Sequence, residues 1–375
     1  MPSGEVHAWN ILDRKPVIVR WDKGVITELT TTDKSPNQNK WIGPPLVDLQ
    51  INGFAGVDFQ QDKLSSEQLI HATSELENSG CNKFFFTLIT SEWELMIKRL
   101  SKAKQLRDRN TKLQKNIVGW HIEGPFLSTE NGYCGAHPSN LMLEPTEARL
   151  TEIREITGKD PVLLTMAPEI ESGLAAFSKA RELGFQVSIG HTNATENIIR
   201  RVTSGGQTGF THLGNGCPTE LRRDDNILWR ALDNGSLTYS LIPDRWHVSP
   251  TLFRILHRLI NNNSIYYTTD AMAAAGSAPG KYQFGHLELE VGTEKIVRLP
   301  GTSNLAGSAL TPINCIHYAS EMLRCDWQVI WKNYSTIPAK FMSLKNSFEI
   351  GAPAEFVEIK TSPNNSIDTI SIHSH

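Results

Sequence analysis

Apolar runs of strand length alternate with segments of helical periodicity through the middle of this 375-residue chain. Most runs are followed by Gly, Asn or Pro punctuation, a rhythm that predicts a parallel α/β fold. The expected strands are residues 46–51, 83–90, 117–122, 162–167, 186–190, 209–213, 237–242 and 265–269. The expected helices include residues 65–79, 92–109, 146–157, 172–183, 195–204 and 250–261. Eight such strands favour a closed (β/α)8 TIM barrel, because these barrels typically take about 250 residues.

Both ends of the chain differ from its middle. Residues 1–45 and 335–375 carry short β-like runs and little helix signal. Because the ends of a domain usually lie close together, these segments are expected to pair beside the barrel as one small sheet or a β-sandwich. The predicted organisation is therefore a barrel domain over residues 46–334 and a small β domain built from the two terminal segments.

The charge balance of the chain is ordinary, with 21% charged residues and a formal net charge of −3. It predicts no basic surface for nucleic acid or an anionic membrane. The five cysteines are widely spread and form no C-x-x-C pair, which argues against a disulfide framework and a thiolate zinc site. Since no apolar stretch has the length of a signal peptide or a membrane span, a cytoplasmic location is expected.

Ionisable and amide side chains gather at or just past the carboxyl ends of successive apolar runs. The set comprises Gln50, Asn52, His121, Glu123, His191, His212, His247 and Asp270. In a (β/α)8 barrel the carboxyl ends of the strands converge on one face, where the active site lies. One pocket is therefore expected to hold the whole set.

Three members of this set have the chemistry of metal ligands. Glu123, His191 and His212 supply one carboxylate and two imidazoles, which suit zinc or another borderline divalent cation with a position left open for water. Such an ion acidifies a bound water and polarises a carbonyl oxygen, and amide hydrolysis needs both effects. Asp270 is placed to take the proton of the attacking water and to pass it to the leaving amine. The pattern indicates a metal-dependent amide hydrolase.

Each of these residues also has a purely structural interpretation. A lone histidine at a strand end is more often a hydrogen-bonded structural residue than a ligand, and Asp270 is a residue type that commonly caps a helix. Glu123 argues for the metal, because a carboxylate after the apolar run 118–122 needs a partner to offset its desolvation. The remaining acidic and histidine candidates are interpreted as cap, surface and helix residues: Asp58, His71 and His257.

Six segments add a family resemblance in their order and spacing. They are PPLVDLQINGFAGVDF at 44–59, GWHIEGPFLSTENGYCGAHP at 119–138, SIGHTNAT at 188–195, THLGNGCP at 211–218, TTDAMAAAG at 268–276 and LAGSALT at 305–311. These segments, above all H-I-E-G-P-F with a later G-A-H, resemble the N-acetylglucosamine-6-phosphate deacetylases of the amidohydrolase superfamily. GAPAEFVEI at 351–359 resembles the last strand of the small β domain in such enzymes.

The resemblance implies roles for the catalytic set. Glu123, His191 and His212 would hold the metal, and Asp270 would be the general acid and base that activates the water. His137 would contact the substrate and help to orient or polarise its acetamide group. The implied reaction is the hydrolysis of N-acetylglucosamine 6-phosphate to glucosamine 6-phosphate and acetate.

The resemblance also implies how a small amino-sugar phosphate is bound. Asn215 and Gly216 would present donors to the sugar phosphate, and His247 would contact the sugar or its phosphate. Arg223 would pair with the phosphate, a task that suits the guanidinium fork. In this family that arginine can come from a neighbouring subunit, so a homodimer is expected.

One departure from the superfamily bears on the metal count. Most amidohydrolases place an H-x-H pair at the end of the first strand to hold a second metal, whereas this chain has Gln50 and Asn52 there. Amide side chains are weak ligands for a borderline cation. One branch of the family has the same Q-x-N and resembles a single-metal enzyme. One divalent ion per subunit is therefore expected, with Zn²⁺ favoured and Fe²⁺, Co²⁺ or Mn²⁺ also compatible.

Two loops depart from the family where the sugar is expected to lie. The family usually reads H-L-F-N-A-M after its sixth strand, whereas residues 212–217 read H-L-G-N-G-C. Residues 243–247, P-D-R-W-H, are bulkier and more basic than the usual form. Because loops 213–224 and 243–247 differ in this way, a deacetylase of another N-acetylated amino sugar, phosphorylated or free, stays open as an alternative. A non-catalytic sugar-phosphate binder on the same barrel is a more distant one.

Overall fold

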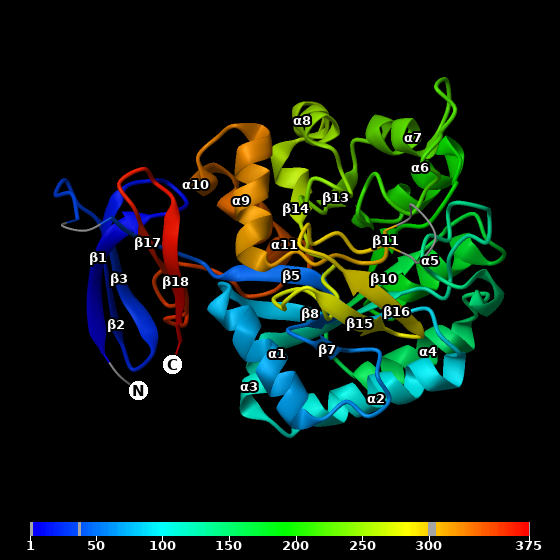
Figure 1. The fold of residues 1–375 in the computed structure, drawn as a ribbon, viewed down its shortest axis with the longest axis horizontal. Coiled ribbons are helices and arrows are strands. Elements are labelled where there is room, and N and C mark those ends of the chain that lie inside the picture. Colours follow the sequence, from blue (N-terminus) through cyan, green and yellow to red (C-terminus); the bar gives the residue numbers. More distant parts are fainter. Residues whose placement is uncertain (1–2, 37–38, 299–304, 375) are drawn as a thin grey trace.

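The computed structural model describes residues 3–36, 39–298 and 305–374. Its centre is a parallel sheet, eight-stranded among the described residues, that curls into a barrel with helices on its outside (Figure 1). The barrel strands are β5 (Leu46–Ile51), β8 (Cys81–Ile89), β9 (Ile117–Glu123), β10 (Val162–Met166), β11 (Gln186–Ile189), β12 (Thr208–Phe210), β13 (Leu237–Leu241) and β14 (Ile265–Tyr267). Every residue of β5 is buried, as expected of a strand enclosed between the barrel interior and a helix layer.

The helices follow the strands along the chain, as the alternating pattern predicts. They are α1 (Ser66–Asn78), α2 (Trp93–Asp108), α3 (Thr111–Asn116), α4 (Glu147–Thr157), α5 (Gly173–Glu182), α6 (Glu196–Ser204), α7 (Ile227–Asp233), α8 (Pro250–Leu259), α9 (Pro312–Leu323), α10 (Trp327–Ile330) and α11 (Thr336–Phe341), with short 3-10 turns at Ser139–Leu141, Asn262–Ser264 and Trp331–Tyr334. Capping residues mark where helices begin. Ser65 and Gln68 form a capping box at α1, and Ser249 caps α8 ahead of Pro250. Among the described residues no helix combines the length and apolar character needed to span a bilayer.

Side chains close the barrel between its first and last strands, where the described backbone pairing is thinnest. Ile51 and Ala271 form an isolated parallel bridge there. The buried Asp48 carboxylate on β5 accepts hydrogen bonds from Thr268 Oγ1 at 2.5 Å and from Thr269 Oγ1 at 2.6 Å, just past β14. We call this junction the β5–β14 seam. It brings residues from the two ends of the barrel sequence to one place.

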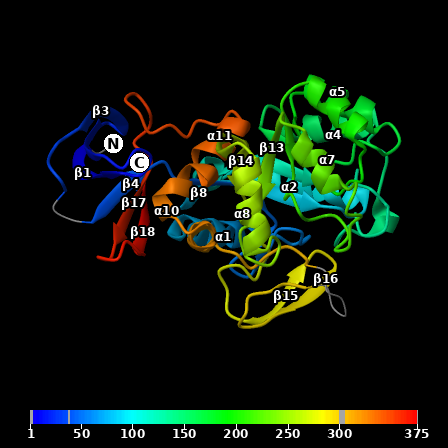
Figure 2. The ribbon, with the colours of Figure 1, turned by 90° about the horizontal axis from the view of Figure 1, so that it is seen from above.

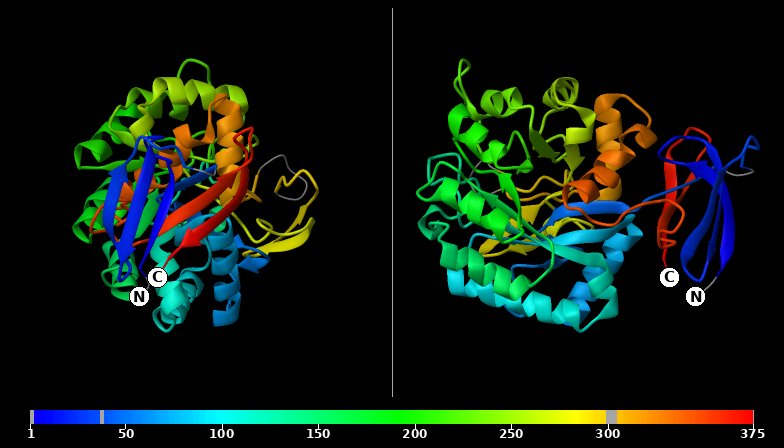
Figure 3. Two further views of the ribbon diagram at one scale, coloured as in Figure 1. Left: turned by 90° about the vertical axis from the view of Figure 1, so that its left-hand side faces the viewer. Right: turned by 180° about the vertical axis from the view of Figure 1, so that it is seen from behind.

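The two ends of the chain form a second sheet beside the barrel (Figures 1 and 3). Its described strands are β1 (Gly4–Asn10), β2 (Pro16–Asp22), β3 (Val25–Thr31), β4 (Lys40–Gly43), β17 (Phe356–Thr361) and β18 (Ile367–His373), in the order β18-β17-β4-β1-β2-β3. Trp21 on β2 nevertheless packs against Phe356 and His373 at ring distances of 5.5 and 4.6 Å. The sheet therefore curls over itself and encloses its own small apolar core, in the manner of a sandwich.

Some elements differ from the sequence-based expectation. Strand β12 ends at Phe210, so His212 lies in the turn beyond it rather than inside the expected strand 209–213. Helix α11 lies within the terminal range 335–375 but contacts β5 and β14 of the barrel. Two small hairpins were not expected, β6 (Gly53–Phe54) with β7 (Val57–Asp58) and β15 (Gly280–Phe284) with β16 (Leu287–Val291). The β15–β16 hairpin projects from the barrel body (Figure 2).

Candidate active site

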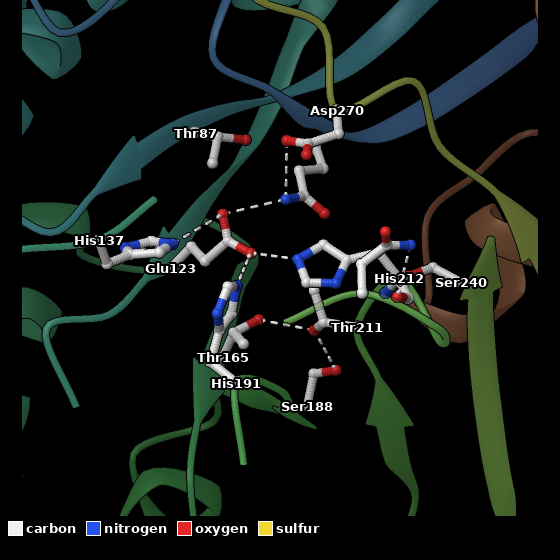
Figure 4. Close-up of polar contacts among 12 residues, drawn as sticks. Thr87, Glu123, His137, Thr165, Ser188, His191, Thr211, His212, Ser240 and Asp270 are labelled. Carbon is white, nitrogen blue, oxygen red and sulfur yellow. Dashed lines mark hydrogen bonds and ion pairs between the residues drawn. The ribbon is translucent and has the colours of Figure 1, made fainter. Parts of the chain in front are cut away.

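Three side chains meet at the carboxyl ends of β9, β11 and β12 (Figure 4). Glu123 Oε1 lies 2.8 Å from His212 Nε2 and 3.5 Å from His191 Nε2. All three side chains are buried, and one ligand atom from each lies within 4.8 Å of the others. Glu123 and His191 were expected just past the ends of strands, and His212 at the end of one. The structure brings all three together.

Hydrogen bonding fixes the tautomer of His191. Its Nδ1 lies 2.9 Å from the Tyr133 carbonyl oxygen, which can only accept, so Nδ1 carries the proton. The Nε2 lone pair is therefore directed to Glu123. An outer partner of this kind is what orients a metal-binding histidine.

The carboxylate of Glu123 is stabilised in its ionised form. Burial raises the pKa of Glu123, but the neighbouring imidazoles of His191 and His212 outweigh that effect and hold the pKa well below its ordinary value. Gln50 Nε2 donates to the other carboxylate oxygen at 3.0 Å. The site thus presents an anionic ligand in a buried position, where a cation would interact with it strongly.

The donor set fits a divalent metal. One carboxylate oxygen and two imidazole nitrogens are ligands that zinc and its neighbours prefer. Two ligand atoms of a tetrahedral ion with bonds near 2 Å lie about 3.3 Å apart. The separations of Glu123 from His191 and His212 fall on either side of that value.

Asp270 lies beside this cluster and is held by amide groups. Its Oδ1 accepts from Asn52 Nδ2 at 2.7 Å and from Gln50 Nε2 at 3.0 Å. Burial, and after it the charge of Glu123, raise the pKa of Asp270 to about 7. The residues that follow it form turns rather than a helix, so Asp270 is not an N-cap. Gln50 and Asn52, at the end of β5, therefore act as hydrogen-bond donors to the Asp270 carboxylate.

The backbone is strained where the site is built. His191, His212 and Asp270 have φ values of 50°, 33° and 51°, in the left-handed region that ordinary residues avoid. Such outliers cluster at functional sites, where the surrounding structure holds them in place. Gly216 has φ 60°, and a Cβ added there would lie 2.9 Å from His191 Nδ1. Only glycine therefore lets this loop pack against the His191 ring.

His137 completes the inner wall of the site. Its Nδ1 lies 2.8 Å from Thr90 Oγ1 and its Nε2 lies 3.9 Å from Glu123 Oε2. Burial, followed by the charge of His191, lowers the pKa of His137 to about 3, so the ring is neutral. A neutral imidazole can donate a hydrogen bond to a carbonyl oxygen.

A layer of small hydroxyl side chains supports the site from below (Figure 4). His121 Nε2 lies 2.9 Å from Thr165 Oγ1, which also contacts Thr211 Oγ1 at 2.9 Å. Thr211 Oγ1 is 2.7 Å from Ser188 Oγ. Burial lowers the pKa of His121 to about 4. His121 is therefore a neutral structural partner beneath Glu123.

A carboxylate holds His247 in place. Asp244 Oδ2 lies 2.6 Å from His247 Nδ1, and Asp244 Oδ1 accepts from the His247 backbone N–H at 2.8 Å. Burial lowers the pKa of His247, but the charge of Asp244 and its hydrogen bond outweigh burial and leave the pKa above its ordinary value. The pKa of Asp244 is correspondingly lowered, despite its burial. The pair therefore favours the cationic form of an imidazole that lines the cavity.

These groups line one cavity of about 610 Å³. The lining includes all three ligands, Asp270, His137, Asn215, Gly216 and His247. Asn215 Nδ2 donates to the His212 carbonyl at 3.2 Å and so also orders the loop. Arg223 is exposed and is absent from the lining of the cavity in its own subunit. The structure therefore gathers every expected site residue except Arg223.

Some functional residues were missed by sequence reasoning. Tyr133 acts through its carbonyl, which leaves no signature in the sequence. Asp244, three residues before His247, is the one that a charge-pairing argument could have found. Phe284 and Arg298 reach the cavity from the excursion between β14 and α9, which sequence patterns did not place over the site.

Comparisons with known proteins agree with this geometry. No protein-family model matches the chain. An N-acetylglucosamine-6-phosphate deacetylase of Bos taurus is 30% identical over 333 residues, which cover 86% of this chain and 80% of that protein. The enzyme of the same name from Danio rerio is 29% identical over 333 residues, covering 85% and 80%. The solved structure of that enzyme from Pasteurella multocida has a TM-score of 0.85 at 22% identity and covers 99% of each chain.

Proposed function

Because the chain belongs to the N-acetylglucosamine-6-phosphate deacetylase family, we propose that it hydrolyses the acetamide of N-acetylglucosamine 6-phosphate to give glucosamine 6-phosphate and acetate. The observation that carries this proposal is the buried cluster of Glu123, His191 and His212 next to Asp270, in a cavity of about 610 Å³. A cavity of that size suits a small molecule.

One divalent ion per subunit would be held by Glu123, His191 and His212. Zinc suits this ligand set, and Fe²⁺, Co²⁺ or Mn²⁺ can use it as well. When bound there, such an ion supplies Lewis-acid polarisation of the amide carbonyl and acidifies water. Gln50 and Asn52 direct their N–H groups to Glu123 and Asp270, which supports a single ion rather than a pair.

Asp270 would move the proton in the reaction. It takes the proton of the attacking water while the new C–O bond forms at the acetyl carbon. It then gives that proton to the sugar nitrogen as the C–N bond breaks, which leaves a free amine and acetic acid, and the acid loses its proton to give acetate. Asn52 and Gln50 keep Asp270 Oδ1 in place through both transfers. Neutral His137 would donate to the acetamide oxygen and so stabilise its developing negative charge.

The remaining residues would bind the sugar phosphate. His247, whose cationic form Asp244 favours, lines the same cavity as Asn215 and Gly216, which would supply donors. Arg223 would serve a neighbouring subunit of a homodimer, an arrangement that its exposed position in its own subunit supports. All five cysteines are free, as expected in the reducing cytoplasm that we propose for the protein.

The test is acetate release by metal-reconstituted enzyme from a panel of N-acetylhexosamines, each with and without a 6-phosphate. We expect N-acetylglucosamine 6-phosphate to have the highest kcat/KM. A preference for a free sugar or for another amino sugar would replace the proposed substrate. No acetate from any member of the panel would overturn the proposed reaction.

Asp270→Asn tests the proton-transfer role of Asp270 separately from metal binding. We expect kcat to fall by roughly 10²- to 10⁴-fold, the usual contribution of a general acid and base. Metal content, measured by elemental analysis of the purified variant, should stay at one equivalent per subunit. Retained turnover would contradict the role of Asp270. Two equivalents in the wild type, both needed for turnover, would contradict the single ion.

A further inference from the structure

Trp246 stands out as a large apolar side chain left open to solvent at the wall of the catalytic cavity. It is 48% exposed and lines that cavity together with His247 and Gly214. We propose that the Trp246 indole is a specificity-determining wall of the deacetylase site. Its face packs against the sugar ring, and its bulk limits what the ring can carry outside the acetamide. The proposal rests on the proposed function.

The loop that carries Trp246 is held in place from two sides. Asp244 Oδ1 accepts a hydrogen bond from the Trp246 backbone N–H at 2.8 Å. The guanidinium of Arg245 lies 4.3 Å from the centre of the Tyr318 ring and forms an ion pair with Glu321, both on α9. Arg245 has φ 73°, a strained conformation that these contacts maintain. Trp246 is thus positioned before any substrate arrives.

Position favours a sugar as the ligand of this indole. The C–H groups on one face of a pyranose carry partial positive charge, and the face of an aromatic ring is negative. Polar groups for the hydroxyls and the phosphate line the same cavity, including Asn215 and His247. Trp229 on α7 is also 48% exposed but does not line the cavity, so exposure alone does not distinguish Trp246.

Trp246 also lines a second cavity. This cavity has a volume of about 310 Å³, and its lining includes Ser277, Lys295 and Tyr318. We expect removal of the indole to open space between the two cavities. A bulkier sugar, such as one with an aglycone on its anomeric oxygen, would then gain room that the wild type denies it.

The loop after β12 also lines the cavity. Gly214 has φ 96°, which favours glycine, and a Cβ added to it would lie 3.6 Å from Val248 Cγ2 and 3.9 Å from Leu252 Cδ2. Gly214 therefore presents no side chain to the cavity, and the exposed aromatic surface on its wall comes from Trp246. This combination explains how two loops that depart from the family could act together on one sugar.

The test compares Trp246→Phe and Trp246→Ala with wild type on N-acetylglucosamine 6-phosphate. Aromatic contacts are worth about 0.5–1.5 kcal/mol, so Trp246→Ala should raise KM roughly twofold to tenfold with little change in kcat. Trp246→Phe should recover most of the wild-type KM. Leu259→Ala, which truncates a 63% exposed side chain at the end of α8, is the control and should leave KM unchanged.

A second measurement tests whether the Trp246 indole limits the size of the sugar. The ratio of kcat/KM for the benzyl glycoside of the substrate to that for the parent sugar should rise in Trp246→Ala, whereas an N-propionyl substrate should show no such relative gain. An unchanged KM, or an unchanged ratio, overturns the proposal. So does a shift in oligomeric mass with unchanged KM, which would make Trp246 an interface residue. If wild type releases no acetate at all, the proposed function fails instead.

Discussion

At the scale of single residues, we expect the Asp244–His247 pair to make binding of a phosphorylated substrate sensitive to pH. The pKa of His247 is raised, so its positive charge is present at pH values below that raised pKa and is lost as the pH rises through it. We expect KM for N-acetylglucosamine 6-phosphate to rise over that interval. Steady-state kinetics from pH 6.5 to 9 measure this, since the phosphate is already largely dianionic above about pH 7.

A variant assigns that pH dependence to the pair. Asp244→Asn removes the charge that raises the pKa of His247. The rise in KM should therefore begin at lower pH than in wild type. The same change should have little effect on the KM of an unphosphorylated sugar. An identical KM profile in the two proteins would exclude His247 as a phosphate contact.

That Glu123, His191 and His212 would lie together could be predicted from the sequence, because the type and the position of these residues both indicate a shared site. Glu123, His191 and His212 are acids and histidines at strand ends, where barrel geometry converges. Their supporting partners could not be predicted in the same way. The Tyr133 carbonyl belongs to a loop whose path depends on tertiary packing, and a backbone oxygen is present in every residue. Arg223 matched a family pattern, but it does not line the cavity of its own subunit, so its role stays a prediction.

At the scale of elements, Asp48 fastens β5 to the end of β14. Five donors reach its carboxylate, including the Thr269 backbone N–H at 3.0 Å and the Tyr334 hydroxyl. Asp48→Ala would leave these buried donors without an acceptor, at a cost of roughly 3–5 kcal/mol. We expect the urea midpoint to fall accordingly, with an unchanged slope.

Two further variants serve as comparisons for Asp48→Ala. Asp13→Ala removes an exposed carboxylate that accepts from the Lys15 backbone N–H within a turn, and it should leave the urea midpoint within error. Asp48→Asn keeps the shape and one acceptor, so its effect should lie between the two. If Asp48→Ala matches Asp13→Ala, the seam is held by other contacts.

Elements with a strong periodic pattern were predictable, and short or context-dependent ones were not. The expected and observed bounds of α1 differ by one residue at each end, and those of α4 differ by one residue at its start. Strand β4 is only four residues long. It pairs with β1 and with β17, which lies near the other end of the chain, so its formation depends on tertiary contacts. The β15–β16 hairpin alternates in polarity, but nothing in its sequence indicates that it lies beside the catalytic cavity.

At the scale of the whole molecule, the metal should contribute to global stability. Its proposed ligands come from β9 and from the turns after β11 and β12, so an ion joins separate parts of the barrel. Ligand binding to the native state alone, at about 1,000 times Kd, contributes about 4 kcal/mol. Chelation should therefore lower Tm by roughly 5 °C in differential scanning calorimetry, and added zinc should restore it.

The control for that effect is a protein that cannot bind the ion. Glu123→Ala removes the anionic ligand from the cluster. Its Tm should not respond to chelator or to added zinc. A response equal to that of wild type would place the stabilising ion elsewhere in the molecule.

The β5–β14 seam has a consequence for the order in which the protein becomes active during synthesis. Glu123, His191 and His212 precede Asp270 in the chain, and β17, which pairs with β4, comes later still. A chain leaving the ribosome from its N-terminus therefore contains all three proposed metal ligands before Asp270, the proposed proton-transfer group, has been made and before the seam can close.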